Sequence, residues 1–123
     1  MKIYLAGPMT GIPHFNFPAF NAAAALLRND GHEVFNPAER DIERHDGVDI
    51  SADNHAGDPA EAVAVHGFSL REALADDTAY ICREADAIAM LPGWENSKGA
   101  RAEHSLAFAL GHTIIYLRSG FDV

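Results

Sequence analysis

The chain has 123 residues, of which 48% are hydrophobic, so it can bury the core of one domain but not of two. Its formal net charge of −9, from 9 Lys and Arg against 18 Asp and Glu, excludes a typical binder of long DNA or RNA, because such proteins neutralise many phosphates. No apolar run approaches the roughly 20 residues that span a bilayer, and a short strand rather than a signal peptide follows Met1-Lys2. We therefore expect a cytoplasmic protein with no membrane partner.

The first third of the chain is typical of a strand, a helix and a second strand. Residues 2–6 are apolar and partly β-branched, and Gly7-Pro8 ends the run in a tight loop, so we expect a strand at the centre of a sheet. An Ala-rich segment at 16–31, with a proline in its first turn and a glycine at its end, predicts a helix. A second short strand follows at 32–35, and the connection through a helix predicts that the two strands are parallel.

The next segment has no clear period. Asn36-Pro37 stops the second strand, and we expect residues 38–67 to form a long loop or insertion with a turn of helix at 59–65. Its acidic and histidine side chains resemble metal ligands in composition, but their spacing fits neither a helical histidine pair nor an EF-hand. We expect a solvated loop and no metal for this cluster of His45, Asp46, Asp49, Asp53, His55 and Asp58.

The second half alternates helices with strands. A capping box at 69–72 opens a helix, an apolar run at 86–91 predicts a buried strand, and a helix at 97–110 precedes a last strand at 113–117. The whole pattern predicts a single-domain, Rossmann-like α/β fold over residues 1–123, a three-layer sandwich with a mostly parallel sheet of about four or five strands. Cys82, the only cysteine, falls in an apolar helical pattern and is expected to be a buried structural residue.

In such folds the ligand binds at the carboxyl ends of the strands. The loop after the first strand brings Gly7, Pro8, Met9 and Thr10 to this edge, where backbone N–H groups could contact a ligand or simply form a turn. Trp94 follows the third strand; it could stack on a planar base or close the core.

Glu103 is the first candidate for chemistry. It lies six residues after Ser97, the expected cap of its helix, and Gly99 shares its helix face without a side chain that would shield it from a ligand. Two alternatives stay open. Glu103 could be a surface residue paired with Lys98 or Arg101, and these two cations could instead hold an anion near the helix start.

Asp77 is the second candidate. It lies on the apolar stripe of its helix with Ala73 and Ile81, whereas Asp76 is rotated toward solvent. A buried carboxylate is usually paired or functional, so Asp77 is expected to handle a proton or bind substrate, with a structural ion pair as the alternative.

Three segments together resemble the nucleoside 2-deoxyribosyltransferase-like superfamily, which includes the deoxynucleoside 5′-monophosphate N-glycosidases. Residues 3–8 are similar to the first strand and loop of that superfamily, residues 84–88 to the acidic entry into its third strand, and residues 97–103 to its Ser/Asp-x-Gly-x-x-x-Glu motif. The chain looks closest to a phage-associated branch.

The resemblance implies cleavage or transfer of the N-glycosidic bond of a nucleoside or nucleotide. Glu103 would be the nucleophile at C1′, Tyr4 would orient it, Asp77 would bind or protonate the substrate, and Ser97 and Gly99 would line the sugar or phosphate side. The resemblance further implies a homodimer or larger homo-oligomer and no cofactor. Thr10 stands where the monophosphate hydrolases carry an arginine, so dependence on a 5′-phosphate stays open. The competing expectations are a non-catalytic nucleotide-binding or sensor module and, third, a structural subunit that docks a partner through its acidic insertion.

Overall fold

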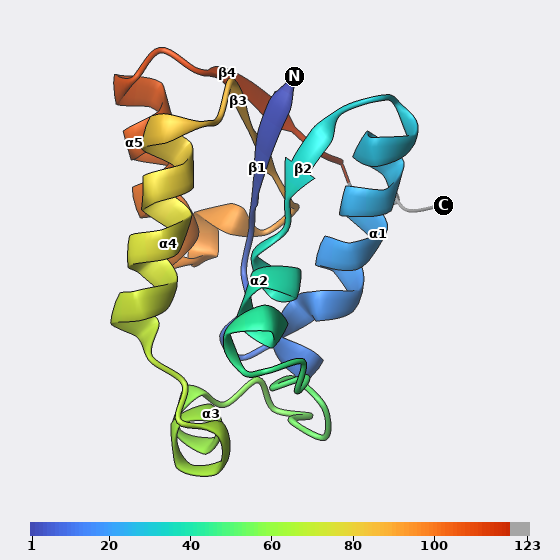
Figure 1. Ribbon diagram of the computed structural model, residues 1–123, viewed down its shortest axis with the longest axis vertical. Helices are drawn as coiled ribbons and strands as arrows, with labels where there is room; N and C mark the ends of the chain where they lie inside the picture. The colour runs from blue at the N-terminus through green and yellow to red at the C-terminus, as the bar shows by residue number, and fades with distance from the viewer. Residues whose placement is uncertain (119–123) are drawn as a thin grey trace.

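The computed structural model describes residues 1–118, and these form a sheet of four parallel strands in the order β2-β1-β3-β4 (Figure 1). The strands are β1 at Lys2–Ala6, β2 at Glu33–Phe35, β3 at Ala87–Met90 and β4 at Thr113–Tyr116. Tyr4 in β1 is paired with Phe35 on one side and with Ile88 on the other. The expected small α/β fold, with a parallel sheet and a central first strand, is confirmed. Residues 119–123, which the expected domain includes, lie outside the described part.

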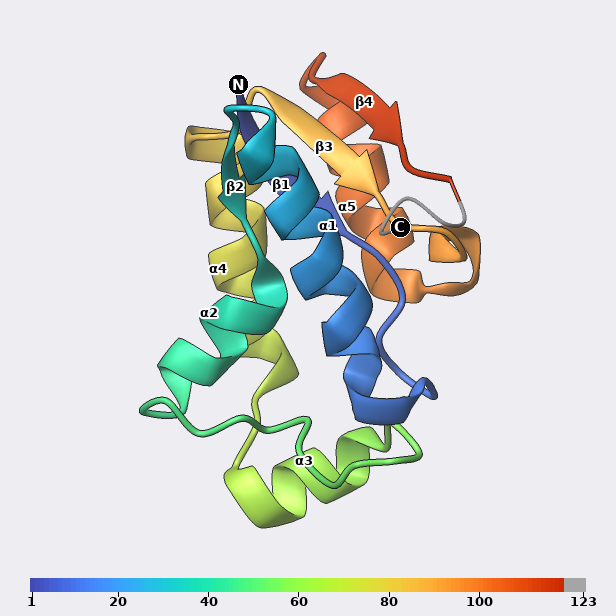
Figure 2. The ribbon, with the colours of Figure 1, turned by 90° about the vertical axis from the view of Figure 1, so that its right-hand side faces the viewer.

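Helices cover both faces of the sheet and make three layers (Figures 1 and 2). Side chains alternate along a strand, so Ile3 and Leu5 of β1 pack on the side of helix α1, Phe17–Asn29. Tyr4 points to the other side, where α4, Leu70–Arg83, and α5, Lys98–Ala109, cover the sheet. β1 and β3 are buried on both faces, which explains their nearly continuous apolar sequence.

The expected starts of two helices are present as caps. The Ser69 hydroxyl accepts a hydrogen bond from the Glu72 N–H at 3.3 Å, and the Ser97 hydroxyl accepts one from the Ala100 N–H at 3.2 Å. A 3₁₀ turn, η1 at Pro13–Asn16, precedes α1, and a second, η2 at Trp94–Asn96, precedes α5. In the described part of the chain, no helix has the length and apolar character that crossing a membrane requires.

The expected loop at 38–67 is wrong at its beginning. Residues Pro37–Arg44 form helix α2. The Asn36 side chain accepts a hydrogen bond from the Ala38 N–H at 3.0 Å, and Pro37 occupies the first helical position, where the missing N–H costs nothing. Asn36-Pro37 therefore starts a helix as well as ending β2.

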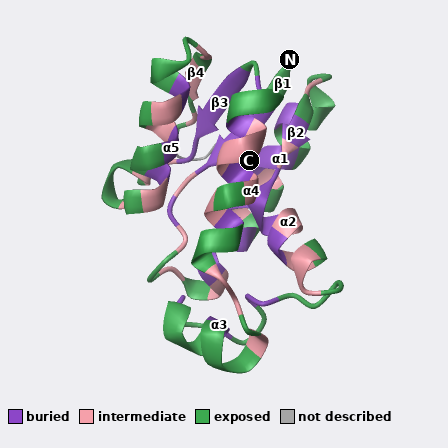
Figure 3. Cartoon of the chain, turned by 60° about the vertical axis from the view of Figure 1, so that its left-hand side comes forward, coloured by how far each residue is buried: buried purple, intermediate pink, exposed green. Residues whose placement is uncertain are grey.

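The end of the same segment is also more ordered than expected. The turn anticipated at 59–65 is helix α3, Pro59–His66, which has Asp58 as its cap. Between α2 and α3 the chain is fastened to the loop after β1, because the Gly11 N–H donates to the Gly57 carbonyl at 2.9 Å and the His14 N–H to the Asn54 carbonyl at 2.8 Å. Figure 3 shows α3 with a mostly exposed outer surface, at the end of the molecule where this segment packs.

The expectation of a buried Cys82 is wrong, because this side chain is exposed. The buried face of α4 is formed by Ala73, Asp77 and Ile81. Cys82 directly follows Ile81 and is therefore rotated about 100° away from that face.

Candidate active site

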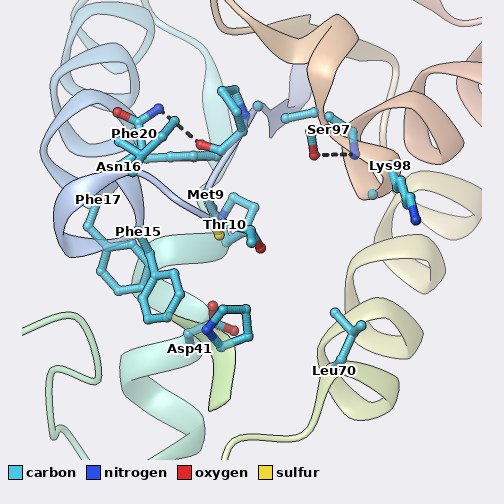
Figure 4. A pocket seen from close by; sticks show the side chains of 18 of the residues that line it. Met9, Thr10, Phe15, Asn16, Phe17, Phe20, Asp41, Leu70, Ser97 and Lys98 are labelled. Atoms are coloured by element: carbon cyan, nitrogen blue, oxygen red, sulfur yellow. Dashed lines mark hydrogen bonds between the residues drawn. The ribbon is translucent and has the colours of Figure 1, made fainter. Parts of the chain in front are cut away.

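A cavity of about 1240 Å³ opens at the carboxyl ends of β1 and β3 (Figure 4). Its lining residues come from the loop after β1 and the start of α5, and from η1, α1 and the segment around α3. Side chains of Tyr4 and Glu103 lie in its wall. This is the edge at which parallel α/β sheets bind ligands, and the volume is ample for a nucleoside.

Glu103 and Tyr4 meet inside the protein although 99 positions separate them. The Tyr4 hydroxyl donates a hydrogen bond to Glu103 Oε2 at 2.7 Å, and the two residues are 1% and 6% exposed, respectively. β1 supplies Tyr4 from the centre of the sheet, and the second turn of α5 supplies Glu103. Glu103 is therefore not the surface residue of the alternative interpretation, and it bonds Tyr4 rather than Lys98 or Arg101.

Burial disfavours the charge of Glu103. It raises the pKa of the carboxyl to about 8, with smaller contributions in the same direction from the negative charges of Asp77 and Asp41. The hydrogen bond from Tyr4 opposes this shift, because it stabilises the carboxylate. Burial also raises the pKa of Tyr4 well above its ordinary value, so its hydroxyl keeps its proton and acts as a donor.

Asp77 lies behind Tyr4 rather than in the cavity wall. It is 7% exposed, and its Oδ1 is buried without a hydrogen bond to any described residue. Burial raises its pKa to about 7, the charge of Asp41 adds to the shift, and both Arg44 and the Tyr4 hydroxyl oppose it. The single proton of Tyr4 is donated to Glu103 in this arrangement, so the same hydroxyl stands between two carboxyl groups that compete for it.

A third carboxylate, Asp41 of α2, completes the cluster and was missed from the sequence. It lines the cavity and is 3% exposed. Burial raises its pKa to about 6, while an ion pair with Arg44 opposes the shift. The sequence signal was available, because a helix that begins at Pro37 places Asp41 and Arg44 three residues apart on one face.

Arg44 links this cluster to α4. Its Nη1 donates to Asp76 Oδ2 at 2.8 Å, and Arg40 Nη2 lies 3.2 Å from the same oxygen. Asp76, expected to be a solvated residue, is instead a partly exposed member of an ion-pair network. The network ties α2 to α4 and thereby sets the position of Asp41 relative to Asp77.

The expected binding loop lies at the cavity, and so do Ser97 and Gly99. Gly7, Pro8, Met9 and Thr10 line it, and the Asn16 side chain fastens the loop by donating to the Pro8 carbonyl at 3.0 Å. A Cβ at Gly99 would meet no described atom within 4 Å, so this position leaves the cavity open. Gly7 has a packing role as well, because a Cβ there would lie 2.6 Å from the Leu91 Cβ.

Trp94 is not among the residues that line the cavity. Its ring stacks on His104 with centroids 4.4 Å apart and an interplanar angle of 15°, and His104 Nε2 lies 2.8 Å from the Tyr116 hydroxyl. The structure thus places Trp94 over α5 and β4, as in the core-closing alternative. The aromatic lining of the cavity comes instead from Phe15, Phe17, Phe20 and Phe68, which the sequence analysis did not single out.

The histidine and acidic residues of the segment at 45–58 are spread along it. Two of them make local contacts: the Asp49 carboxylate accepts from the Ser51 hydroxyl at 2.6 Å, and His45 Nδ1 lies 2.7 Å from the Asp41 carbonyl. Within residues 1–118, no three His, Cys, Asp or Glu side chains are grouped so that they could hold a metal ion. Local loop structure therefore accounts for much of this polar composition.

No curated protein and no solved structure matches the chain. A family profile does match it, over residues 1–116, which include all the strands and helices described above. The chain belongs to the family described as Domain of unknown function (DUF4406).

Proposed function

We propose that the protein cleaves or transfers the N-glycosidic bond of a nucleoside or nucleotide, with Glu103 as the nucleophile. The observation that carries this proposal is the buried 2.7 Å hydrogen bond between Tyr4 and Glu103 in the wall of a large cavity at the carboxyl edge of the sheet. A carboxylate held in this way can attack an anomeric carbon, and neighbouring carboxyl groups can supply the proton that a leaving base needs.

The proposed reaction has two steps. Glu103 Oε1, which the Tyr4 hydroxyl leaves free, forms a bond to C1′ while the bond from C1′ to the base nitrogen breaks. The electron pair stays on the base, which takes a proton from the Tyr4 hydroxyl while neutral Asp77, behind Tyr4 and outside the cavity wall, replaces that proton on Tyr4. Water or the nitrogen of a second base then attacks C1′ and releases Glu103. Hydrolysis and transfer differ only in this acceptor.

The chemistry requires opposite protonation states of the two carboxyl groups. Glu103 must be ionised and the proton donor neutral, whereas pKa values of about 8 and about 7 favour the reverse arrangement at neutral pH. The active form is then a minor fraction of the enzyme, and base release is expected to be greatest between these two values. The Tyr4 hydrogen bond increases this fraction, since it stabilises the ionised nucleophile.

The same pKa of Glu103 favours one alternative function. A neutral Glu103 is a poor nucleophile and a good hydrogen-bond donor, which suits a non-catalytic nucleotide-binding or sensor module. Such a module would bind nucleotides equally well with Glu103 replaced by glutamine and would release no base in either form.

The proposal extends to assembly and location. The apolar side chains of Phe108 and Leu110 at the end of α5, and the ring of Tyr116 on edge strand β4, are exposed in the single chain. We propose that a second copy covers them in a homodimer or larger homo-oligomer and that the protein acts in the cytoplasm. Light scattering of the purified protein measures the assembly, and a monomer at micromolar concentration would refute this part.

The activity is tested by incubating deoxynucleosides and their 5′-monophosphates with the wild type and with Glu103→Ala, and by measuring the released base. The matched control is Glu95→Ala, which removes an exposed carboxylate from η2 near the same edge. We expect base release by the wild type and the control and none by Glu103→Ala. Equal release by wild type and Glu103→Ala would remove the assignment. Addition of a second free base separates transfer from hydrolysis.

A further inference from the structure

Asp41 is a cavity carboxylate with one oxygen unused. Its Oδ1 pairs with Arg44, and no hydrogen bond between described residues engages its Oδ2. The side chain is 97% buried within the protein, yet it lines the cavity. Asp41 Oδ2 is not among the fully buried side-chain atoms that lack a partner, so this acceptor, without a partner in residues 1–118 and at the wall of a large cavity, is open to a donor group of a ligand.

The protonation state decides what Asp41 can bind. Its pKa of about 6 means that it is mostly ionised at neutral pH, in contrast to Glu103. An ionised carboxylate only accepts hydrogen bonds, so the group opposite must be a donor. A ligand carbonyl oxygen in the same place would also be an acceptor, so it could not form a hydrogen bond with the Asp41 carboxylate.

The surroundings of Asp41 determine the shape of that ligand group. Figure 4 shows Asp41 on the same side of the cavity as the rings of Phe15 and Phe17, with Ser97 and Lys98 across from them. Phe15 and Phe17 are buried members of the core and therefore form a fixed apolar surface. A flat ring suits this side of the cavity, whereas the sugar belongs on the side of Glu103 and the start of α5.

We propose that Asp41 sets ligand specificity by accepting a hydrogen bond from an amino group on a planar heteroaromatic ring that lies along the Phe15 and Phe17 side of the cavity. Within the proposed function, on which this inference rests, the preferred substrates carry an amino-substituted base. Their oxo counterparts, in which a carbonyl replaces the amino group, bind more weakly.

The test measures binding without turnover, in the Glu103→Gln background. Calorimetry gives the dissociation constants of two matched pairs, 2′-deoxyadenosine with 2′-deoxyinosine and 2′-deoxycytidine with 2′-deoxyuridine. We expect the amino member of at least one pair to bind about tenfold more tightly or better, since a hydrogen bond to a charged group is lost in the other member. Equal affinities within both pairs, or no binding of any of the four nucleosides, would overturn the proposal, and no Asp41 variant would then be needed.

Asp41→Asn in the same background tests the residue itself. An amide can donate to a carbonyl, so the preference is expected to disappear or to reverse. Asp76→Asn is the matched control: it also removes a carboxylate partner of Arg44, but Asp76 does not line the cavity, and the preference should persist. Asp41→Ser, whose hydroxyl can donate or accept, is the second variant if the asparagine does not fold. A preference that survives the change at Asp41 would contradict the inference.

Failure of this inference is separable from failure of the proposed function. Base release by the wild-type protein decides whether the bond is cleaved, and it does not depend on which base is preferred. The affinity ratios in the Glu103→Gln background decide the role of Asp41, and they do not depend on cleavage.

Discussion

The buried carboxyl group of Glu103 should make the stability of the protein depend on pH in a direction opposite to that of most acidic residues. In the unfolded chain the group ionises near its ordinary pKa of 4.5, whereas in the folded protein it ionises only near 8. Between these values the folded state holds a proton that the unfolded state has lost. The free energy of unfolding must therefore fall as the pH rises through this window, and the loss is complete above about pH 8.

The magnitude follows from the width of the window. Each pH unit between the two pKa values removes up to about 1.4 kcal/mol, so the full loss from Glu103 is on the order of 3–5 kcal/mol. This is a large part of the 5–15 kcal/mol that is usual for a domain. Glu103→Gln keeps the shape of the side chain and an acceptor for Tyr4 but removes the ionisation.

Urea unfolding of the wild type and Glu103→Gln at pH 5, 7 and 9 measures the effect. Relative to the wild type, the variant should gain several kcal/mol between pH 5 and pH 9, whatever the difference between them at pH 5. Glu95→Gln, at an exposed position, should show no such gain. A gain for Glu103→Gln below about 1 kcal/mol over this range would refute the account of a buried, neutral Glu103.

Three further substitutions have defined outcomes. Tyr4→Phe removes the donor that stabilises ionised Glu103 and so raises the pKa of Glu103, the higher of the two pKa values; maximal base release should fall by about tenfold and the half-maximal pH on the alkaline side should move up by about one unit, as pH–rate profiles would show, and an unchanged profile would exclude this role. Gly57→Ala should loosen the segment before α3, because Gly57 has a φ of 62° and a Cβ there would lie 2.2 Å from the Ile12 carbonyl oxygen. Limited proteolysis should therefore cut this segment faster in the variant than in the wild type. Equal cleavage rates would contradict the packing of Gly57 against Ile12. Ser97→Ala removes the cap of α5 and should lower the free energy of unfolding by about 1 kcal/mol in urea titrations, whereas a change near zero would mean that water replaces the cap.

The fold could be predicted where local sequence and tertiary packing favour the same structure. The apolar runs of β1 and β3 and the serine caps of α4 and α5 are such cases, and each element lies within a residue or two of its expected place. The segment at 38–67 differs, because α2 is a short, highly charged helix. Its stability depends on a cap and on ion pairs across to α4, which a search for apolar periodicity does not detect.

In the candidate site, too, the residues placed by local pattern could be predicted and those placed by tertiary packing could not. Burial of Glu103 and Asp77 follows from their helix faces, and the parallel order of the strands brings Tyr4 to the same place. Asp41 could not be placed without α2, and its contact with the cavity depends on how α2 packs. The position of Trp94 could not be predicted from local pattern either, because it depends on the His104 ring of α5, on which the indole ring stacks.

The central claim is that Glu103 becomes covalently bonded to the sugar during the reaction. It is tested most directly by mixing the wild-type protein with the deoxynucleoside that it cleaves fastest, quenching in acid, and measuring the intact mass and the modified peptide by mass spectrometry. The account predicts a deoxyribosyl adduct on the peptide that contains Glu103, absent from Glu103→Gln and present in Glu95→Gln. Base release without any adduct on that peptide, or an adduct on another residue, would contradict it.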